Sequence, residues 1–276
     1  MKNKFDASII VKYLILLVLA AIVLVPLSVI VLSAFKTRIE LSRYSLFSLP
    51  HSFMLDNFIE VYKKAEIPLA LKNTAIITCT SVALNVILGA MVSYILARFE
   101  FKSKKIVLSS FMVAMIIPFT TIEVARFSII NSLGLFNTYW APIFIYVGAD
   151  LIQIFVYKQF IDNIPVSLDE SAMMDGASYI TIFTRIIFPL VVPASLTIAI
   201  IKFVDISNDM YTPYLYIPSD SLRTLTTALM IFQGERTLDW GKLSSGVILI
   251  MAPPLILYFI FQKRIFAGLV AGASKE

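Results

Sequence analysis

The chain has 276 residues, of which 59% are hydrophobic and only 15% are charged, and its mean hydropathy is +0.86. The net charge of +5 is small and dispersed, which argues against nucleic acid as a partner. A single cysteine and a single histidine exclude an internal disulfide and a zinc cluster. Several apolar runs approach or exceed the ~18 residues typical of a membrane-spanning helix. The composition therefore predicts an all-α, multi-pass membrane protein.

Six apolar segments are long enough to cross ~30 Å of hydrocarbon at a helical rise of ~1.5 Å per residue. They are Tyr13–Phe35, Thr74–Ala97, Ile106–Val124, Tyr139–Phe160, Ile186–Ser207 and Leu243–Phe261. The first is longer than the ~7–15-residue apolar core of a secretory signal, so we expect it to be a retained span. Prolines within spans are tolerated and kink them. The whole chain, 1–276, is expected to form one transmembrane domain.

Basic residues are densest in the N-terminal flank, in the loop Arg98–Lys105 (RFEFKSKK) and after the sixth span. Lysine and arginine concentrate on the cytoplasmic side of a membrane. Both termini are therefore predicted to be cytoplasmic in the cell membrane, and so is the connection between spans four and five. The segments 36–73 and 208–242 are then external, and their mixture of aromatic, proline and charged residues predicts folded caps.

The connection at 165–188 allows two interpretations from its residues alone. In the first it is only a turn: Ser167 and Glu170 have the S-x-x-E spacing of a capping box, and Gly176 supplies the left-handed residue that ends a short helix. In the second it is a docking surface, because a carboxylate at a helix start suits an arginine of a partner, and small residues such as Ser171 allow close approach. The physical pattern leaves both open.

Resemblance to a known family favours docking. Residues 169–193, DESAMMDGASYITIFTRIIFPLVVP, resemble the EAA loop of ATP-binding-cassette importer permeases, whose pattern is E-A-A, then D-G-A, then an apolar run into L-P. The matching positions are Glu170, Ala172, Asp175, Gly176, Ala177, Phe183, Ile186, Pro189 and Pro193. Ser171 replaces the usual first alanine, and Phe188 replaces the usual leucine before proline.

Three further stretches resemble the carbohydrate branch of this family. They are residues 130–140 (INSLGLFNTYW), 231–241 (IFQGERTLDWG) and 266–275 (FAGLVAGASK). The similarity runs in patches from about the third span to the C-terminus. The chain thus resembles the second, six-span permease subunit of a maltose-type importer, which implies the type I importer permease fold with a cytoplasmic EAA coupling helix.

The resemblance also implies roles and partners. The implied ATPase-coupling residues are Glu170, Ser171, Ala172, Asp175, Gly176 and Ala177, with secondary tail contacts at Gly272, Ser274 and Lys275. The implied partners are a second homologous permease, two copies of a cytoplasmic ATPase, a carbohydrate substrate and an external solute-binding protein that meets Pro213–Lys242. Magnesium-bound ATP would be held by the ATPases, so this chain is expected to need no cofactor and to be no enzyme.

Four ionisable residues lie within or at the edges of the spans, where such groups cost roughly 2.5–3.5 kcal/mol and usually face partners or water. Spacing favours a local Lys202–Asp205 pair over an Asp150–Lys202 pair, whose members differ by about 9 Å in depth. Glu123 and Arg126 share the i,i+3 spacing. Either these pairs fix helix packing, or span five lines a polar pathway. The pathway candidates are Asp150, Lys202, Asp205, Asn208, Asp209 and Tyr211, although Ser207 replaces the tryptophan of the family's W-N motif.

Two other classes of function compete with a permease subunit. An ion-driven secondary transporter of a small polar solute would show internal repeats with interrupted helices, and the two halves of the chain show no convincing repeat. An intramembrane enzyme would need paired carboxylates or a serine with a base, and Glu123 and Asp150 lack a recognisable motif. The substrate stays open among disaccharides, oligosaccharides, polyols and glycerol phosphate esters, as does the question of which permease holds it.

Overall fold

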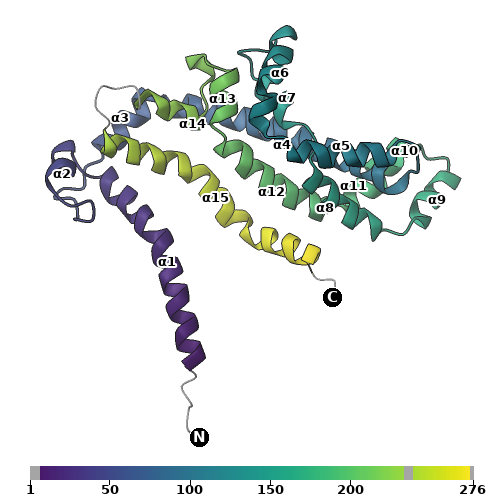
Figure 1. Cartoon of the computed structure of the whole chain (residues 1–276), viewed down its shortest axis with the longest axis horizontal. Helices are drawn as coiled ribbons and strands as arrows, with labels where there is room; N and C mark the ends of the chain where they lie inside the picture. The colour runs from purple at the N-terminus through teal and green to yellow at the C-terminus, as the bar shows by residue number, and fades with distance from the viewer. Residues whose placement is uncertain (1–6, 233–238, 274–276) are drawn as a thin grey trace, which may run out of the picture. The chain divides into compact units, whose positions relative to one another are not determined.

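The computed structural model describes residues 7–232 and 239–273, and within these ranges the chain forms helices and no β-strand (Figure 1). The all-α prediction is therefore confirmed. The first helices are α1 (Ala7–Ala34), α2 (Arg38–Arg43), α3 (Asp56–Lys64), α4 (Ile67–Arg98), α5 (Lys104–Ile116), α6 (Phe119–Ser132), α7 (Trp140–Tyr146), α8 (Leu151–Asp162) and α9 (Ser167–Met174). They are followed by α10 (Tyr179–Ile182), the π-helix η1 (Phe183–Ile187), α11 (Phe188–Leu190), α12 (Val192–Asn208), α13 (Tyr211–Tyr216), the 3₁₀-helix η2 (Asp220–Leu222), α14 (Leu225–Ala228), the 3₁₀-helix η3 (Leu229–Phe232) and α15 (Trp240–Ala273).

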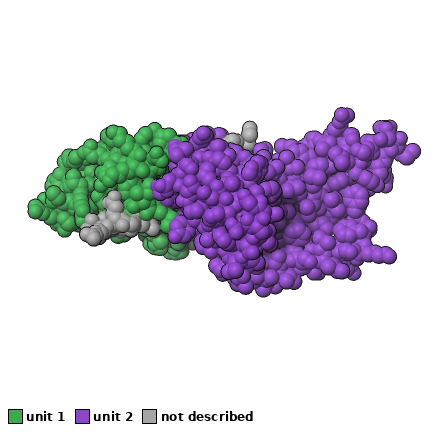
Figure 2. All heavy atoms as spheres, turned by 90° about the horizontal axis from the view of Figure 1, so that it is seen from above, with its two compact units in different colours: residues 1–68, 228–253 green, residues 69–227, 254–276 purple. Residues whose placement is uncertain are grey.

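The chain divides into two compact units, coloured separately in Figure 2. Unit 1 comprises residues 1–68 and 228–253, and unit 2 comprises residues 69–227 and 254–276. Unit 2 contains most of the helices, including α9 and the segments predicted as spans three to five. The candidate functional residues of the coupling loop and of the polar pathway therefore all belong to unit 2.

Three helices in the described part of the chain are long and apolar enough to cross a membrane by themselves. They contain the candidate spans Val11–Ala34, Ile67–Arg98 and Trp240–Ile260. Val11–Ala34 has a mean hydropathy of 3.2 and none of its best window is buried within the protein. Such a surface is unfavourable in water and is matched by a lipid environment.

The segments predicted as spans three, four and five are each divided into two helices. α5 and α6 meet at 109°, α7 and α8 at 54°, and the helical run Tyr179–Leu190 meets α12 at 77°. The first break lies at Ile117, whose backbone is extended, and at Pro118, which precedes the first residue of α6. If each bent pair is one span, the described residues hold up to six spans, so the six-span count stays a prediction.

Buried polar side chains of α4 compensate the break between α7 and α8. The Nδ2 atom of Asn85 donates hydrogen bonds to the carbonyl oxygens of Tyr146, at 3.0 Å, and Gly148, at 2.9 Å. Gln153 at the start of α8 donates from Nε2 to the Oδ1 atom of Asn85 at 3.0 Å. A membrane helix can be interrupted only where such groups satisfy the freed backbone, so α4 stabilises the bend.

A close approach of α4 and α8 depends on Gly89. A Cβ atom at this position would lie 2.1 Å from the side chain of Gln153, inside any allowed contact distance. Around this contact, buried apolar residues of α4, α8, α10, η1 and α12 form the main core of unit 2, among them Ala90, Tyr157 and Ile187. The core thus lies directly beneath the segment 165–188.

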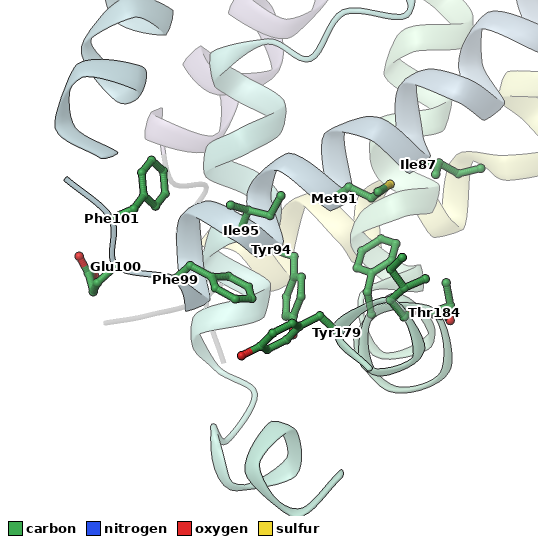
Figure 3. A pocket seen from close by; sticks show the side chains of 11 residues that line it. Ile87, Met91, Tyr94, Ile95, Phe99, Glu100, Phe101, Tyr179 and Thr184 are labelled. Carbon is green, nitrogen blue, oxygen red and sulfur yellow. Dashed lines mark hydrogen bonds between the residues drawn. The ribbon is translucent and has the colours of Figure 1, made fainter. Parts of the chain in front are cut away.

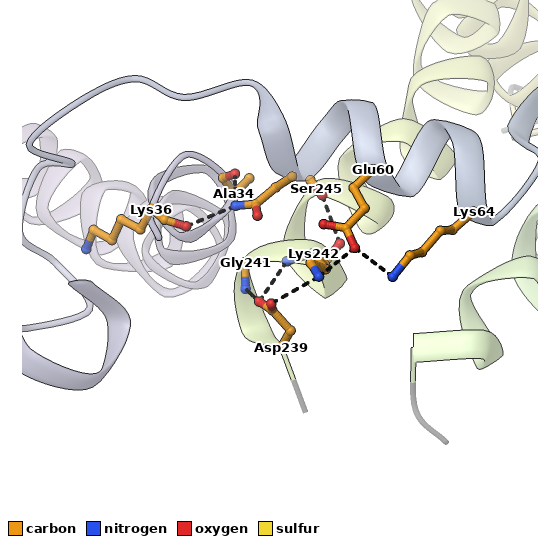
Figure 4. Close-up of polar contacts among 9 residues, drawn as sticks. Ala34, Lys36, Glu60, Lys64, Asp239, Gly241, Lys242 and Ser245 are labelled. Atoms are coloured by element: carbon orange, nitrogen blue, oxygen red, sulfur yellow. Dashed lines mark hydrogen bonds and ion pairs between the residues drawn. The ribbon is translucent and has the colours of Figure 1, made fainter. Parts of the chain in front are cut away.

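Unit 1 contains a polar network in the predicted external segments (Figure 4). Glu60 of α3 accepts from the Nζ atoms of Lys64 and Lys242 at 2.7 Å each. Asn57 donates to the carbonyl oxygens of Ala34 and Lys36 at 2.9 Å, which satisfies backbone groups at the end of α1. The segment after α1 is therefore folded by specific contacts rather than extended as a linker.

Candidate functional site

The EAA-like segment forms a short helix with a defined end. α9 runs from Ser167 to Met174 and lies at one end of unit 2, beyond α8 and α10 (Figure 1). Gly176 has a φ of +82°, and the N–H groups of Gly176 and Ala177 donate to the carbonyl oxygens of Met173, at 3.0 Å, and Ala172, at 2.9 Å. These two bonds define a Schellman motif, so the prediction that Gly176 ends the helix is confirmed.

The predicted capping box is wrong. Ser167 is the first residue of α9, and the residue before it, Val166, already has helical backbone angles and makes no side-chain cap. The N–H groups of Leu168 and Glu170 donate instead to the carbonyl oxygens of Pro165 and Val166, at 3.2 Å and 3.1 Å. The backbone therefore starts its first turn at Pro165, and the Glu170 carboxylate is left out of the cap.

The exposed edge of α9 carries most of the predicted ATPase-coupling residues. Glu170, Ser171, Asp175 and Gly176 are all exposed. Among the described residues, no hydrogen bond or ion pair engages the side chains of Glu170, Ser171 or Asp175. An exposed carboxylate without a local partner is available to a cation of another protein.

The remaining two predicted positions face the opposite way. Ala172 and Ala177 are half-buried and pack against the core of unit 2. Their small size therefore serves the seating of α9 on this chain. The structure thus separates the six positions into an outward edge of four residues and an inward pair.

A buried ion pair that is not among the sequence-predicted site residues holds the inward face of α9. The Nε atom of Arg98, the last residue of α4, lies 2.7 Å from Oδ2 of Asp169, and the two side chains are only 9% and 4% exposed. The Nη2 atom of Arg98 also donates to the carbonyl oxygen of Ile164 at 2.7 Å. The sequence carried one signal for the inward orientation of Asp169. Its i,i+3 spacing from Ala172 places both residues on the same face of the helix.

Aromatic side chains join α4 to α10 next to this ion pair. Tyr94 of α4 packs against Phe183 of η1, and Phe99, which directly follows α4, packs edge-to-face against Tyr179 of α10, at ring centroid distances of 5.7 Å and 5.0 Å. They line an apolar groove of about 620 Å³, which Figure 3 shows between the end of α4 and α10. The base of the EAA-like segment is thus attached to α4 by both charge and aromatic packing.

A second ion pair joins two of the predicted spans. The Nζ atom of Lys202 in α12 contacts Oδ2 of Asp150, whose Oδ1 accepts from the N–H of Gln153 at 2.8 Å and so caps α8. The predicted local pair of Lys202 with Asp205 is wrong, and Asp205 is exposed. A difference in depth of about 9 Å holds only for straight spans. The 54° bend instead places Asp150 at the start of a separate helix, within reach of Lys202.

At the end of α12 and just after it, Asp209 has a structural role, whereas Asn208 and Tyr211 are exposed. Asp209 accepts hydrogen bonds from the hydroxyl of Tyr146 at 2.8 Å, the hydroxyl of Thr212 at 2.6 Å and the N–H of Tyr211 at 2.8 Å. Its carboxylate therefore ties α7 to α13 and is not free for a solute. Asn208 and Tyr211 are exposed, and these two side chains remain accessible.

The Glu123–Arg126 pair is present as the spacing predicted. The Nη1 atom of Arg126 lies 3.1 Å from Oε2 of Glu123. The buried hydroxyl of Tyr216 donates to Oε1 of the same carboxylate at 2.6 Å. The pair therefore anchors α13 to α6, which is a packing role.

The described residues include only one of the three predicted tail contacts. Gly272 lies in the last turn of α15, whereas Ser274 and Lys275 lie outside the described residues. Of the segment 231–241, residues 233–238 also lie outside them, while Asp239 accepts from the N–H groups of Gly241 and Lys242 at 3.1 Å and 3.3 Å at the start of α15.

Comparison with known proteins identifies the family. Residues 85–270 match the model of the binding-protein-dependent transport system inner membrane component. The chain belongs to this family. As a binding-protein-dependent permease it is a transport subunit of an ATP-driven importer and not an enzyme. It is a membrane protein with several apolar helices. Membership in this family favours a permease subunit over an ion-driven transporter and over an intramembrane enzyme.

Relatives of this permease cover nearly its whole length. It is 34% identical over 267 residues to the melibiose/raffinose/stachyose import permease MelC of Bacillus subtilis, covering 95% of this chain and 96% of MelC. It is 31% identical over 225 residues to the trehalose/maltose permease MalG of Thermococcus litoralis, covering 80% and 81% of the two chains. A crystal structure of a bacterial ABC transporter that imports alginate contains a chain of the same fold, with a TM-score of 0.82 at 18% identity over 95% of this permease and 98% of that chain.

Proposed function

We propose that this permease forms, with a second homologous permease, the transmembrane pathway of a carbohydrate importer, and that α9 is its contact with a cytoplasmic ATPase. The observation that carries the ATPase contact is the outward edge of α9, where Glu170 is exposed and has no partner among the described residues. The carbohydrate class is supported by relatives that are permeases for melibiose, raffinose and stachyose and for trehalose and maltose.

The geometry of α9 suits a rigid docking element. Its inward face is fixed by Asp169 and Ala172, and its end is set by Gly176, so the outward edge keeps one orientation. Glu170 then offers a carboxylate for a charge-assisted hydrogen bond with an arginine or lysine of the ATPase. Ser171 and Asp175, with no bulky side chains, allow the partner surface to approach the backbone.

The wider assembly follows from this contact. Two ATPase copies, one under each permease, would bind magnesium and ATP, and this chain would hold no cofactor. The tail residues Gly272, Ser274 and Lys275 would add a second contact with the ATPases, and the segment Pro213–Lys242 would meet an external solute-binding protein. This arrangement requires six spans with both termini in the cytoplasm.

A polar pathway along α12 is the second part of the proposal. The charges of Asp150 and Lys202 neutralise each other, and the two side chains are partly exposed. Asp205, Asn208 and Tyr211 are exposed on α12 or just after it. Amide, hydroxyl and aromatic groups together match the hydrogen-bonding and apolar faces of sugars. Asp209 would support this surface from behind through its bond with Tyr146.

The test of the ATPase contact is co-purification of the cognate ATPase with the complete transporter in detergent. Glu170→Lys and Gly176→Asp are expected to lose the ATPase, because one reverses the charge of the docking edge and the other adds a negatively charged side chain to the exposed surface that the partner approaches. The matched control is Asp162→Lys, which reverses an exposed acid at the end of the neighbouring α8. Retention of the ATPase by both variants, or equal loss in the control, would refute α9 as the contact.

A further inference from the structure

Arg98 connects three parts of unit 2 through one guanidinium. It is the last residue of α4, it contacts Asp169 of α9, and it donates to the carbonyl oxygen of Ile164 in the connection between α8 and α9. Both sides of the entry into α9 are therefore tied to the end of one long helix. The side chains of Arg98 and Asp169 are 9% and 4% exposed, so this contact lies within the protein.

Asp169 depends on this arginine. Among the described residues, neither carboxylate oxygen of Asp169 receives a well-aligned hydrogen bond, and Arg98 is the one cation within ion-pair distance. A buried charge is costly unless it is paired. Removing the guanidinium would therefore leave the carboxylate uncompensated and release the inward face of α9.

Apolar packing contributes little to holding α9. Leu168, Met173 and Met174 are 42%, 41% and 89% exposed, and the inward face offers only small side chains such as Ala172. α10 differs, because its Tyr179 packs on the ring of Phe99, which directly follows α4. The left-handed Gly176 separates α9 from α10. α9 is thus attached to the body of the unit mainly by the ion pair.

The other end of the same path lies at the polar pathway. From Arg98, α4 runs back to Asn85, about 20 Å away along the helix. Asn85 holds the carbonyl oxygens of Tyr146 and Gly148 at the break before Asp150, and Asp150 contacts Lys202. An unbroken series of observed contacts therefore leads from α9 through α4 to the candidate pathway.

We propose that the Arg98–Asp169 pair is the strut that passes ATP-driven movement of α9 to α4. Arg98 and Asp169 are then positioning residues for coupling, acting behind the exposed contact residues. This inference rests on the proposed docking of the ATPase on α9. This ion pair keeps α9 and the end of α4 together while both move. Without it, α9 rotates about the segments that connect it to α8 and α10.

The test measures the distance between α9 and α4 by pulsed electron paramagnetic resonance in the complete transporter. Spin labels are placed at Met174→Cys and Leu88→Cys, both exposed positions, in a Cys79→Ser background. With the ion pair intact, we expect the same distance distribution in the nucleotide-free state and in the state trapped with ATP and vanadate. In Asp169→Asn the distance is expected to change by several ångströms on trapping.

Two further variants separate a strut from a general packing role. The exchange of Arg98→Asp with Asp169→Arg is expected to restore the constant distance, because it restores the opposite charges. The double variant Arg98→Gln with Asp169→Asn leaves no lone buried charge and carries the test if single variants fail to insert, with the same distance change expected. A constant distance in the neutral variants would overturn the strut, as would a wild-type distance that changes as much as theirs.

The two proposals fail in different ways. If Glu170→Lys still retains the ATPase, docking on α9 is wrong whatever the label distances show. If docking holds and the distance in Asp169→Asn behaves as in the wild type, only the strut is wrong.

Discussion

Replacing Gly176 by alanine is expected to weaken ATPase binding without changing any side-chain contact. Gly176 has a φ of +82°, and a Cβ atom built on it meets nothing within 4 Å. The cost of the substitution is therefore the backbone cost of the left-handed region alone, roughly 1–2 kcal/mol for a residue with a Cβ atom. If the helix end relaxes to avoid this strain, the population that presents α9 correctly falls by about 5- to 30-fold.

The assay is equilibrium binding of the purified, fluorescently labelled cognate ATPase to the permease pair in nanodiscs. The Kd is expected to rise by the same factor of about 5 to 30. Asparagine tolerates the left-handed region better than other residues with side chains, so Gly176→Asn is expected to bind more tightly than Gly176→Ala.

Gly134 supplies a matched control in the same unit. It also has a positive φ, +68°, with nothing within 4 Å of a built Cβ atom, and it lies in the turn after α6, far along the chain from α9. Gly134→Ala therefore carries the same type of backbone strain but should leave the Kd for the ATPase unchanged. Equal effects of the two alanine variants, or a wild-type Kd for Gly176→Ala, would refute the reasoning.

Three other outcomes are expected. Lys202→Ala should lower uptake of the carbohydrate that the cognate binding protein retains while stimulation of ATP hydrolysis survives, and normal uptake by a well-expressed variant would remove Lys202 from the pathway. Gly89→Ala should lower thermal stability, because its Cβ would lie 2.1 Å from Gln153 and overpacking costs typically about 1–3 kcal/mol. Adding Gln153→Ala should recover part of the loss. If stability does not recover, the strain does not arise from this contact. Hydrogen bonds from Lys242 and then Lys64 hold the pKa of Glu60 below its ordinary value of 4.5, so its contribution to stability should be present above that value and be lost as the pH falls through the lowered pKa. Melting curves of Glu60→Gln should show a weaker loss in that acidic range than the wild type, and identical pH profiles would contradict the assignment.

Features that depend on neighbouring residues were predictable. Gly176 ends α9 because a residue without a Cβ atom is favoured where the helix turns left-handed, and this signal lies within one helix turn. The Glu123–Arg126 pair is likewise set by helical spacing. The capping box failed although it is also local, because Pro165 and Val166 already supply the carbonyl oxygens that accept from the first N–H groups.

Contacts between residues far apart in the chain were not predictable in the same way. The sequence placed Arg98 in a basic loop as a marker of orientation, and only the fold brings its guanidinium under α9. Sequence spacing disfavours the Asp150–Lys202 pair, since straight helices separate the two residues in depth. The bend before α8 removes that separation.

That residues 169–193 are the candidate ATPase contact follows from their resemblance to the EAA loop. The sequence by itself determined the helical membrane class and the end of the short helix at Gly176. Each of these depends on composition or on spacing within a few residues, which the chain carries locally. Only the tertiary structure decided which charges meet, which faces of α9 point inward, and where three of the predicted spans break. Those depend on the path of α4, α8 and α12 through the protein, because an ion pair forms only when folding brings two distant side chains within a few ångströms.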